Sequence, residues 1–178
     1  MIINIGYKKG IYYFTREEDL IFQGKVKNGW WNSSNLLYDN YENTIAKVNE
    51  KWTKFILLPK YVVFYKDDVF EVTPQAMIKE YWTVDYKNKH YEIVIHKGLK
   101  YSVFKDSKQI AYFIKQAVTF GTARNILIEL NNDEDIELIC TFAFALCCDF
   151  EETSDININL GLTLGEYKKF DNKWKAKI

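Results

Sequence analysis

The feature that most constrains how this chain folds is an almost wholly apolar segment near its C-terminal end, residues 136–150. Glu137 and Thr141 are its main polar interruptions. The preceding residues, 131–135, read Asn-Asn-Asp-Glu-Asp and supply side chains that cap a helix and carboxylates that favour its first turn. The pattern predicts a helix near residues 133–149 that is hydrophobic on all sides, and such a helix has to be enclosed by protein or lipid.

The length of this segment decides between the two enclosures. At 1.5 Å per residue the helix would be about 20 Å long, whereas a membrane-spanning helix needs about 20 apolar residues. The segment therefore suits the interior of a small barrel, and its small residues, Ala143, Ala145, Cys147 and Cys148, would let strands approach closely. A buried strand is the alternative, because periodicity alone does not separate short apolar runs. We favour the helix.

Short apolar and aromatic runs separated by turn-forming residues make up most of the remaining chain. Strands are predicted over residues 11–15, 20–26, 35–39, 44–49, 55–58, 61–65, 69–73, 77–85, 91–96, 101–104, 109–114 and 125–130. About a dozen strands joined by tight turns is more than an open sheet usually holds. We therefore expect a mostly β fold, a closed antiparallel barrel of about twelve strands around the central hydrophobic helix.

Alternation within one predicted strand assigns its two faces. Over residues 91–96, Tyr91, Ile93 and Ile95 share one face, which we expect to be buried. The other face carries Glu92, Val94 and His96, and we expect it to be mostly in contact with water.

A second alternating run follows the apolar segment. Residues 156–165 alternate apolar side chains with Asn, Gly and Thr in period two, which predicts a C-terminal extra strand, and a lysine-rich end follows. The expected organisation is a barrel over residues 1–152 and an extension over residues 153–178. Three roles are open for the extension: it closes a seam of the barrel, pairs with another subunit or remains mobile. Our hypothesis is that it docks on a strand edge of the same chain.

Composition excludes several classes of protein. The 178 residues carry no net charge, although residues 44–124 sum to +6 and residues 125–178 to −6. The balanced charge and abundant aromatic residues argue against disorder. The three cysteines all lie in the apolar segment, so we expect no disulfide framework. The N-terminal apolar run is too short for a signal peptide, and a cytoplasmic protein is expected.

No motif for catalysis or metal binding is visible. The two histidines, His90 and His96, do not form a zinc-binding pattern, and nucleotide-binding and nucleophile motifs do not occur. Asp133 begins an acidic stretch that resembles the start of a calcium-binding loop. Such a loop needs glycine at its sixth position, where this chain has Leu138. Helix capping explains the carboxylates instead. We expect no enzyme activity, no metal and no cofactor.

Lysines beside predicted turns are the candidate ligand-binding residues. In a meander, alternate turns lie at the same end, so one rim would gather Lys87, Lys89, Lys105 and Lys108, while Lys97 and Lys100 would lie at the other. Such a rim suits a phosphorylated head group or an anionic membrane surface, although turn lysines also serve simply as solvated residues.

A tryptophan pair is the candidate membrane contact. Trp30 and Trp31 lie in a loop-like stretch, where they would either anchor the protein at a bilayer or pack in the core. Nucleic acid is not expected as a partner, because only Arg16 and Arg124 supply guanidinium groups.

Residues 91–149 resemble the LURP-one-related and phospholipid scramblase branch of the tubby C-terminal-like superfamily. The resemblance rests on the runs YEIVI, YSVFKD, QIAYFIK and ILIEL, followed by FAFALCCD, which is similar to the core helix of that family. It implies a twelve-stranded barrel around a hydrophobic helix in proteins that are mostly not enzymes. Tubby-like members bind phosphoinositide head groups through basic residues, and scramblases associate with membranes and calcium. The chain lacks a cysteine-rich palmitoylation site outside the helix, which argues against scramblase activity.

The function expected from the sequence is a non-catalytic barrel domain that binds an anionic lipid head group or membrane surface, peripheral to the membrane. A structural or protein-interaction module with no lipid ligand is the alternative. Oligomeric state does not follow from the sequence.

Overall fold

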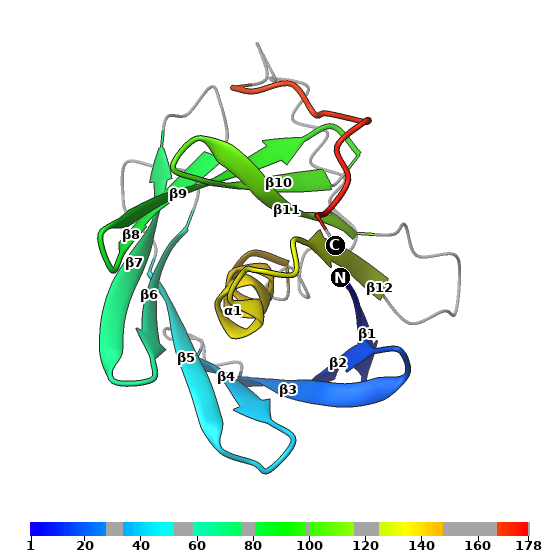
Figure 1. Cartoon of the computed structure of the whole chain (residues 1–178). Coiled ribbons are helices and arrows are strands. Elements are labelled where there is room, and N and C mark those ends of the chain that lie inside the picture. Colours follow the sequence, from blue (N-terminus) through cyan, green and yellow to red (C-terminus); the bar gives the residue numbers. More distant parts are fainter. Residues whose placement is uncertain are drawn as a thin grey trace.

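A closed antiparallel barrel of twelve strands surrounds one helix in the computed structural model of the chain (Figure 1). The structure describes residues 1–27, 34–51, 59–75, 81–98, 100–115, 125–147 and 167–177. The strands are β1 (Ile2–Lys8), β2 (Ile11–Arg16), β3 (Asp19–Lys27), β4 (Ser34–Asp39), β5 (Thr44–Lys51), β6 (Lys60–Tyr65), β7 (Asp68–Gln75), β8 (Tyr81–Tyr86), β9 (Lys89–His96), β10 (Lys100–Lys105), β11 (Lys108–Lys115) and β12 (Asn125–Leu130). The predicted fold class is confirmed.

Each strand pairs with its neighbours along the chain, and β1 closes the ring by pairing with β12. β1 is not among the strands that the pattern predicts, although Ile3 and Ile5 alternate with Asn4 and are fully buried. The predicted strand over residues 55–58 lies outside the described residues. Because every connection joins neighbouring strands, successive turns alternate between the two rims of the barrel.

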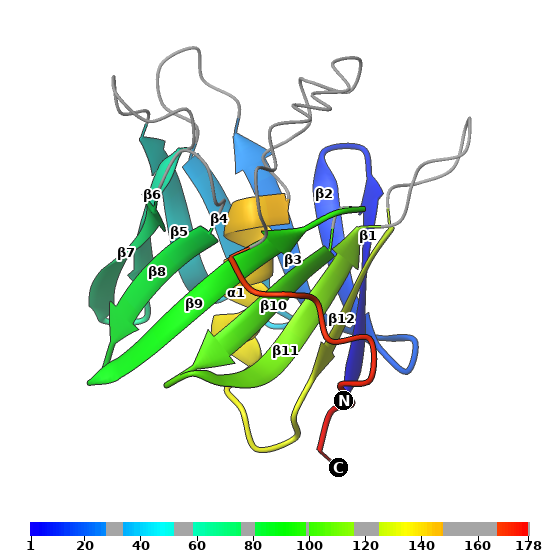
Figure 2. The ribbon, with the colours of Figure 1, turned by 90° about the horizontal axis from the view of Figure 1, so that it is seen from above.

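Helix α1 (Ile136–Cys147) occupies the middle of the ring and runs along its length (Figures 1 and 2). The side chains of residues 138–146 are at most 2% exposed and pack against the inward-facing side chains of the strands. The helix prediction is therefore correct and the buried-strand alternative is wrong. The Asp135 carboxylate accepts a hydrogen bond of 3.1 Å from the Leu138 backbone N–H, which is the cap that the acidic string predicts.

Close packing fixes the helix against the strands on one side. The Phe144 ring makes edge contacts with Tyr12 and Phe14, at centroid distances of 6.0 and 6.2 Å. It faces Gly24 of β3, where an added Cβ would lie 2.4 Å from a ring carbon. The missing side chain at residue 24 is what makes room for Phe144.

Residues 167–177, here called the C-terminal strap, cross the outer face of the wall from β8 to β12 (Figure 2). The expectation that Glu92, Val94 and His96 face water is wrong: they are 9%, 0% and 6% exposed, because the strap covers this part of the wall. Docking on a strand edge is also wrong for the described part of the extension, since a closed barrel has no free edge. The predicted strand over residues 156–165 lies outside the described residues.

Candidate functional site

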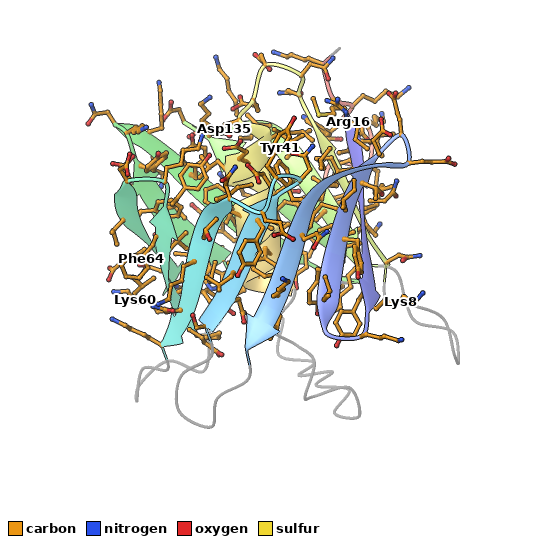
Figure 3. The ribbon with its side chains drawn as sticks, turned by 90° about the horizontal axis from the view of Figure 1, so that it is seen from below. Lys8, Arg16, Tyr41, Lys60, Phe64 and Asp135 are labelled. Carbon is orange, nitrogen blue, oxygen red and sulfur yellow. The ribbon has the colours of Figure 1, made fainter. Side chains whose placement is uncertain are left out.

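The apolar helix fills the middle of the barrel, so the described surfaces open to a partner are the two rims and the outer wall. One rim lies where α1 begins and carries the turns between β2 and β3, β4 and β5, β6 and β7, β8 and β9, and β10 and β11. The other lies where α1 ends. Figure 3 shows Arg16 and Asp135 at the first rim and Lys8 and Lys60 at the second.

The four lysines predicted as an anion site all lie on the rim where α1 begins. Lys87 and Lys89 belong to the turn between β8 and β9, and Lys105 pairs with Lys108 at the end of the β10–β11 hairpin. In the first of these turns, Lys87 and Asn88 both have positive φ angles, 48° and 59°. This conformation matches a tight two-residue hairpin turn. The structure thus groups these lysines on one rim, as hairpin alternation predicts.

Three of these lysines pair with carboxylates from neighbouring turns. Lys87 Nζ lies 3.3 Å from Asp68 Oδ2, Lys89 Nζ 3.2 Å from Asp106 Oδ2, and Lys105 Nζ 2.8 Å from Glu134 Oε2. The hydrogen bond to Glu134 raises the pKa of Lys105, and contacts with the Tyr86 hydroxyl and Asp68 raise the pKa of Lys87. An incoming anion would have to compete with these carboxylates.

The rim as a whole is acidic. Its turns and strand ends, residues 16–19, 39–43, 66–68, 85–90, 105–108 and 131–135, carry twelve acidic and six basic residues. A shallow depression of about 440 Å³ opens beside the β8–β9 turn, and its lining mixes Lys87, Lys89 and His90 with Asp85 and Asp106. We call this end of the barrel the acidic rim.

The carboxylates at the start of α1, Asp135 and Glu137, bind side chains of the barrel. The Tyr65 hydroxyl, which lies in the mouth of the barrel, donates to Asp135 at 3.2 Å and approaches Glu137 at 3.4 Å. Burial and these two carboxylates raise the pKa of Tyr65. Lys66 pairs with Glu137 at 2.7 Å. Within the part of the chain that the structure describes, no group of His, Cys, Asp and Glu side chains is arranged to hold a metal ion.

The described part of the opposite rim is basic. Among the described turns and strand ends here there is one acidic residue, Glu50, and there are eight lysines, which are Lys8, Lys9, Lys27, Lys51, Lys60, Lys97, Lys100 and Lys115. Lys8, Lys9, Lys51 and Lys97 are exposed. Lys60 pairs with Glu71 at 2.6 Å, and the Lys100 ammonium lies 4.8 Å from the centroid of the Phe170 ring. We call this end of the barrel the basic rim.

The four predicted lysines lie at the rim opposite to the strand ends that flank the tryptophan pair. Trp30 and Trp31 lie outside the described residues. Lys27 and Ser34, the described residues on either side of that segment, pair with each other at the basic rim. The four predicted lysines lie at the acidic rim, at the other end of the strands. Hairpin alternation predicts Lys97 and Lys100 at the basic rim, and the structure adds the other lysines of that rim.

Both histidines have ordinary structural partners. His90 Nδ1 lies 2.7 Å from Asp85 Oδ1 on the surface, and the buried His96 Nε2 is hydrogen bonded to Ser102 Oγ at 3.0 Å.

Comparisons of the chain with protein-family models, with curated proteins and with solved structures found no match. Among the described residues, no helix has the length and apolar character needed to cross a membrane.

Proposed function

We propose that this protein is a non-catalytic binding domain that attaches to an anionic membrane surface through its basic rim. The observation that carries the proposal is the opposite charge of the described parts of the two rims: eight lysines and one acidic residue at one end, and twelve acidic and six basic residues at the other. The proposed contact residues are Lys8, Lys9, Lys51 and Lys97, which are exposed.

Charge of this kind both attracts and orients the barrel. A lysine close to an anionic bilayer contributes about 1 kcal/mol, so several lysines of the basic rim together give measurable binding. The acidic rim is repelled by the same surface, and a membrane would therefore select one end of the barrel. This moves the proposed anion contact away from Lys87, Lys89, Lys105 and Lys108, whose end of the barrel is acidic.

The membrane role of Trp30 and Trp31 stays part of the proposal. The strand ends that flank them, Lys27 and Ser34, belong to the basic rim, so lysines and tryptophans would face the same membrane. We also propose that the chain is a tubby-like barrel of the LURP-one-related and scramblase branch. A twelve-stranded antiparallel barrel with a helix is consistent with that resemblance.

Vesicle flotation tests the proposal. The full chain should float with phosphatidylcholine vesicles that contain phosphatidylserine, and not with phosphatidylcholine alone. Binding should weaken steeply as the Debye length falls from about 10 Å at 0.1 M salt to about 3 Å at 1 M.

Charge reversal at the two rims identifies the surface that binds. Reversal of Lys8, Lys9 and Lys97 to Glu should weaken binding about 100-fold or more, because each lysine lost costs about 1 kcal/mol. The matched control reverses Lys87, Lys89 and Lys108 and should leave binding almost unchanged. No flotation at low salt, or equal losses from the two triple variants, would refute the proposal.

A further inference from the structure

The first two residues of the strap, Tyr167 and Lys168, bind the buried carboxylate of Glu92. Glu92 Oε1 accepts a hydrogen bond of 2.8 Å from the Tyr167 hydroxyl, and Glu92 Oε2 pairs with the Lys168 ammonium. The Tyr167 ring stacks on Tyr81 at a centroid distance of 4.0 Å, and Lys168 lies 4.2 Å from the centroid of the Phe104 ring. Burial raises the pKa of Glu92, but the hydrogen bonds from Lys168 and Tyr167 outweigh burial and hold the pKa below its usual value.

The middle of the strap is held by two aromatic side chains. Phe170 packs edge-on against His96 and Tyr112, at centroid distances of 5.2 and 6.0 Å. Trp174 also packs on Tyr112, at 5.6 Å, and its indole N–H donates to the Gln109 carbonyl at 3.3 Å.

The last residues of the strap are held through their backbone. The Ala176 N–H donates to Glu129 Oε1 at 3.1 Å, and the Lys177 N–H donates to Asn131 Oδ1 at 2.8 Å. The Lys177 carbonyl accepts from the Asn132 N–H at 3.1 Å. Glu129 Oε2 in turn accepts the Tyr112 hydroxyl at 2.6 Å, which holds that carboxylate in position.

These contacts have the chemistry of a peptide-binding site. The wall contributes a carboxylate for a Tyr-Lys pair, an aromatic surface for Phe and Trp, and side-chain oxygens for two backbone N–H groups. All of these groups lie on strands, or just after β12, and the strands are paired on both sides within the closed barrel. The framework that positions them therefore does not depend on the strap. Because a closed barrel has no free edge, recognition depends on these side chains rather than on strand addition.

We propose that the outer wall of β8 to β12 is a peptide-binding site, filled in cis by the C-terminal strap and able to accept the same strap from a second copy of the chain. The second copy is the occupant because its strap carries the side chains that already fit each part of the wall. Exchange of an identical element between copies is a low-cost route to a dimer. The tethered strap competes with an effective concentration on the order of 1 mM, so binding in trans appears when the cis strap is weakened.

A labelled synthetic peptide of residues 167–177 tests the site in the full-length chain. Phe170→Ala with Trp174→Ala weakens the cis strap, and both side chains lie outside the barrel core. This variant should bind the peptide in fluorescence anisotropy at least tenfold more tightly than the wild type, whose site is occupied. Adding Glu92→Gln to the variant should weaken peptide binding at least tenfold, and a peptide with both aromatic residues replaced by Ala should not bind.

A mixture of two full-length variants tests the second-copy occupant. Glu92→Gln keeps an intact strap with a damaged site, whereas Phe170→Ala with Trp174→Ala keeps an intact site with a damaged strap. Their mixture should form a 1:1 complex in analytical ultracentrifugation, and neither variant alone should associate to the same extent.

Three results would overturn the inference. They are the absence of peptide binding up to about 1 mM, peptide binding that does not depend on Glu92, and peptide binding without the mixed complex. Near-ultraviolet circular dichroism checks that each variant keeps its barrel. Should the double variant unfold, Lys168→Glu replaces it, because this one surface substitution also weakens the cis strap. The peptide-binding and mixed-complex experiments then have the same expected results.

Discussion

Replacement of Gly24 by Ala tests how closely the helix presses on the barrel wall. The added Cβ would lie 2.4 Å from one carbon of the Phe144 ring and 2.9 Å from another. Tyr12 and Phe14 pack around the same ring, so it cannot move aside without disturbing the core. Overpacking of this kind costs about 1–3 kcal/mol, which for a chain of this size lowers Tm by roughly 2–12 °C.

The sign of this effect makes the test sharp. Gly→Ala at an unstrained position usually stabilises a protein by about 0.4–1 kcal/mol, because it lowers the entropy of the unfolded chain. Gly6→Ala on β1 is the matched control, since the nearest atom to its added Cβ is Asn125 Oδ1 at 3.9 Å. Urea unfolding followed by tryptophan fluorescence measures both variants. Phe144→Leu in the Gly24→Ala background should restore part of the loss, and a Gly24→Ala chain as stable as Gly6→Ala would refute the packing.

Three further predictions follow from single contacts. Asp135→Ala should lower the free energy of unfolding, measured in urea, by about 1 kcal/mol through loss of the helix cap. Asp135→Asn and the exposed control Asp133→Ala should lower it only slightly, and equal losses of stability in all three variants would contradict the cap. Burial and the hydrogen bond to Glu129 raise the pKa of Tyr112 to about 12. Its contribution to stability is therefore present below the unfolded pKa of about 10 and is lost as pH rises toward 12. In thermal melts across this pH range, Tm should fall less for Tyr112→Phe than for the wild type. Because the pKa of Glu92 is lowered, its contribution to strap binding is present above the ordinary glutamate value and is lost as pH falls through the folded pKa; acid-induced exposure of Trp174, followed by fluorescence quenching, should occur at higher pH in Lys168→Ala than in the wild type.

Most of the fold could be predicted because the pattern of apolar residues along the chain determines which elements form and how they are enclosed. A segment that is apolar on all sides has to be enclosed, and a dozen short strands have to close, so the plugged barrel follows from residues 136–150 and the strand runs together. β1 is not among the predicted strands although Ile3 and Ile5 alternate with Asn4, because the apolar run at the N-terminus is short and ends before Lys8 and Lys9.

The surfaces were harder to predict because they depend on residues far apart in the sequence. Alternation separates the two faces of β9 but does not indicate that a segment 75 residues away covers Glu92. Hairpin parity places Lys87 and Lys89 on one rim, whereas their partners Asp68 and Asp106 come from other turns. Hairpin parity also assigns the other charged turn residues to one rim or the other, and the opposite charge of the rims follows only from all of them together.

Lysine footprinting on the unmodified chain tests the orientation on the membrane most directly. Brief acetylation with and without vesicles that contain phosphatidylserine, followed by mass spectrometry, reports the protection of each lysine. Membrane binding through the basic rim predicts protection of Lys8, Lys9 and Lys97, with Lys87 and Lys108 unchanged. Protection of Lys87 and Lys108 instead, or equal protection at both rims, would contradict it.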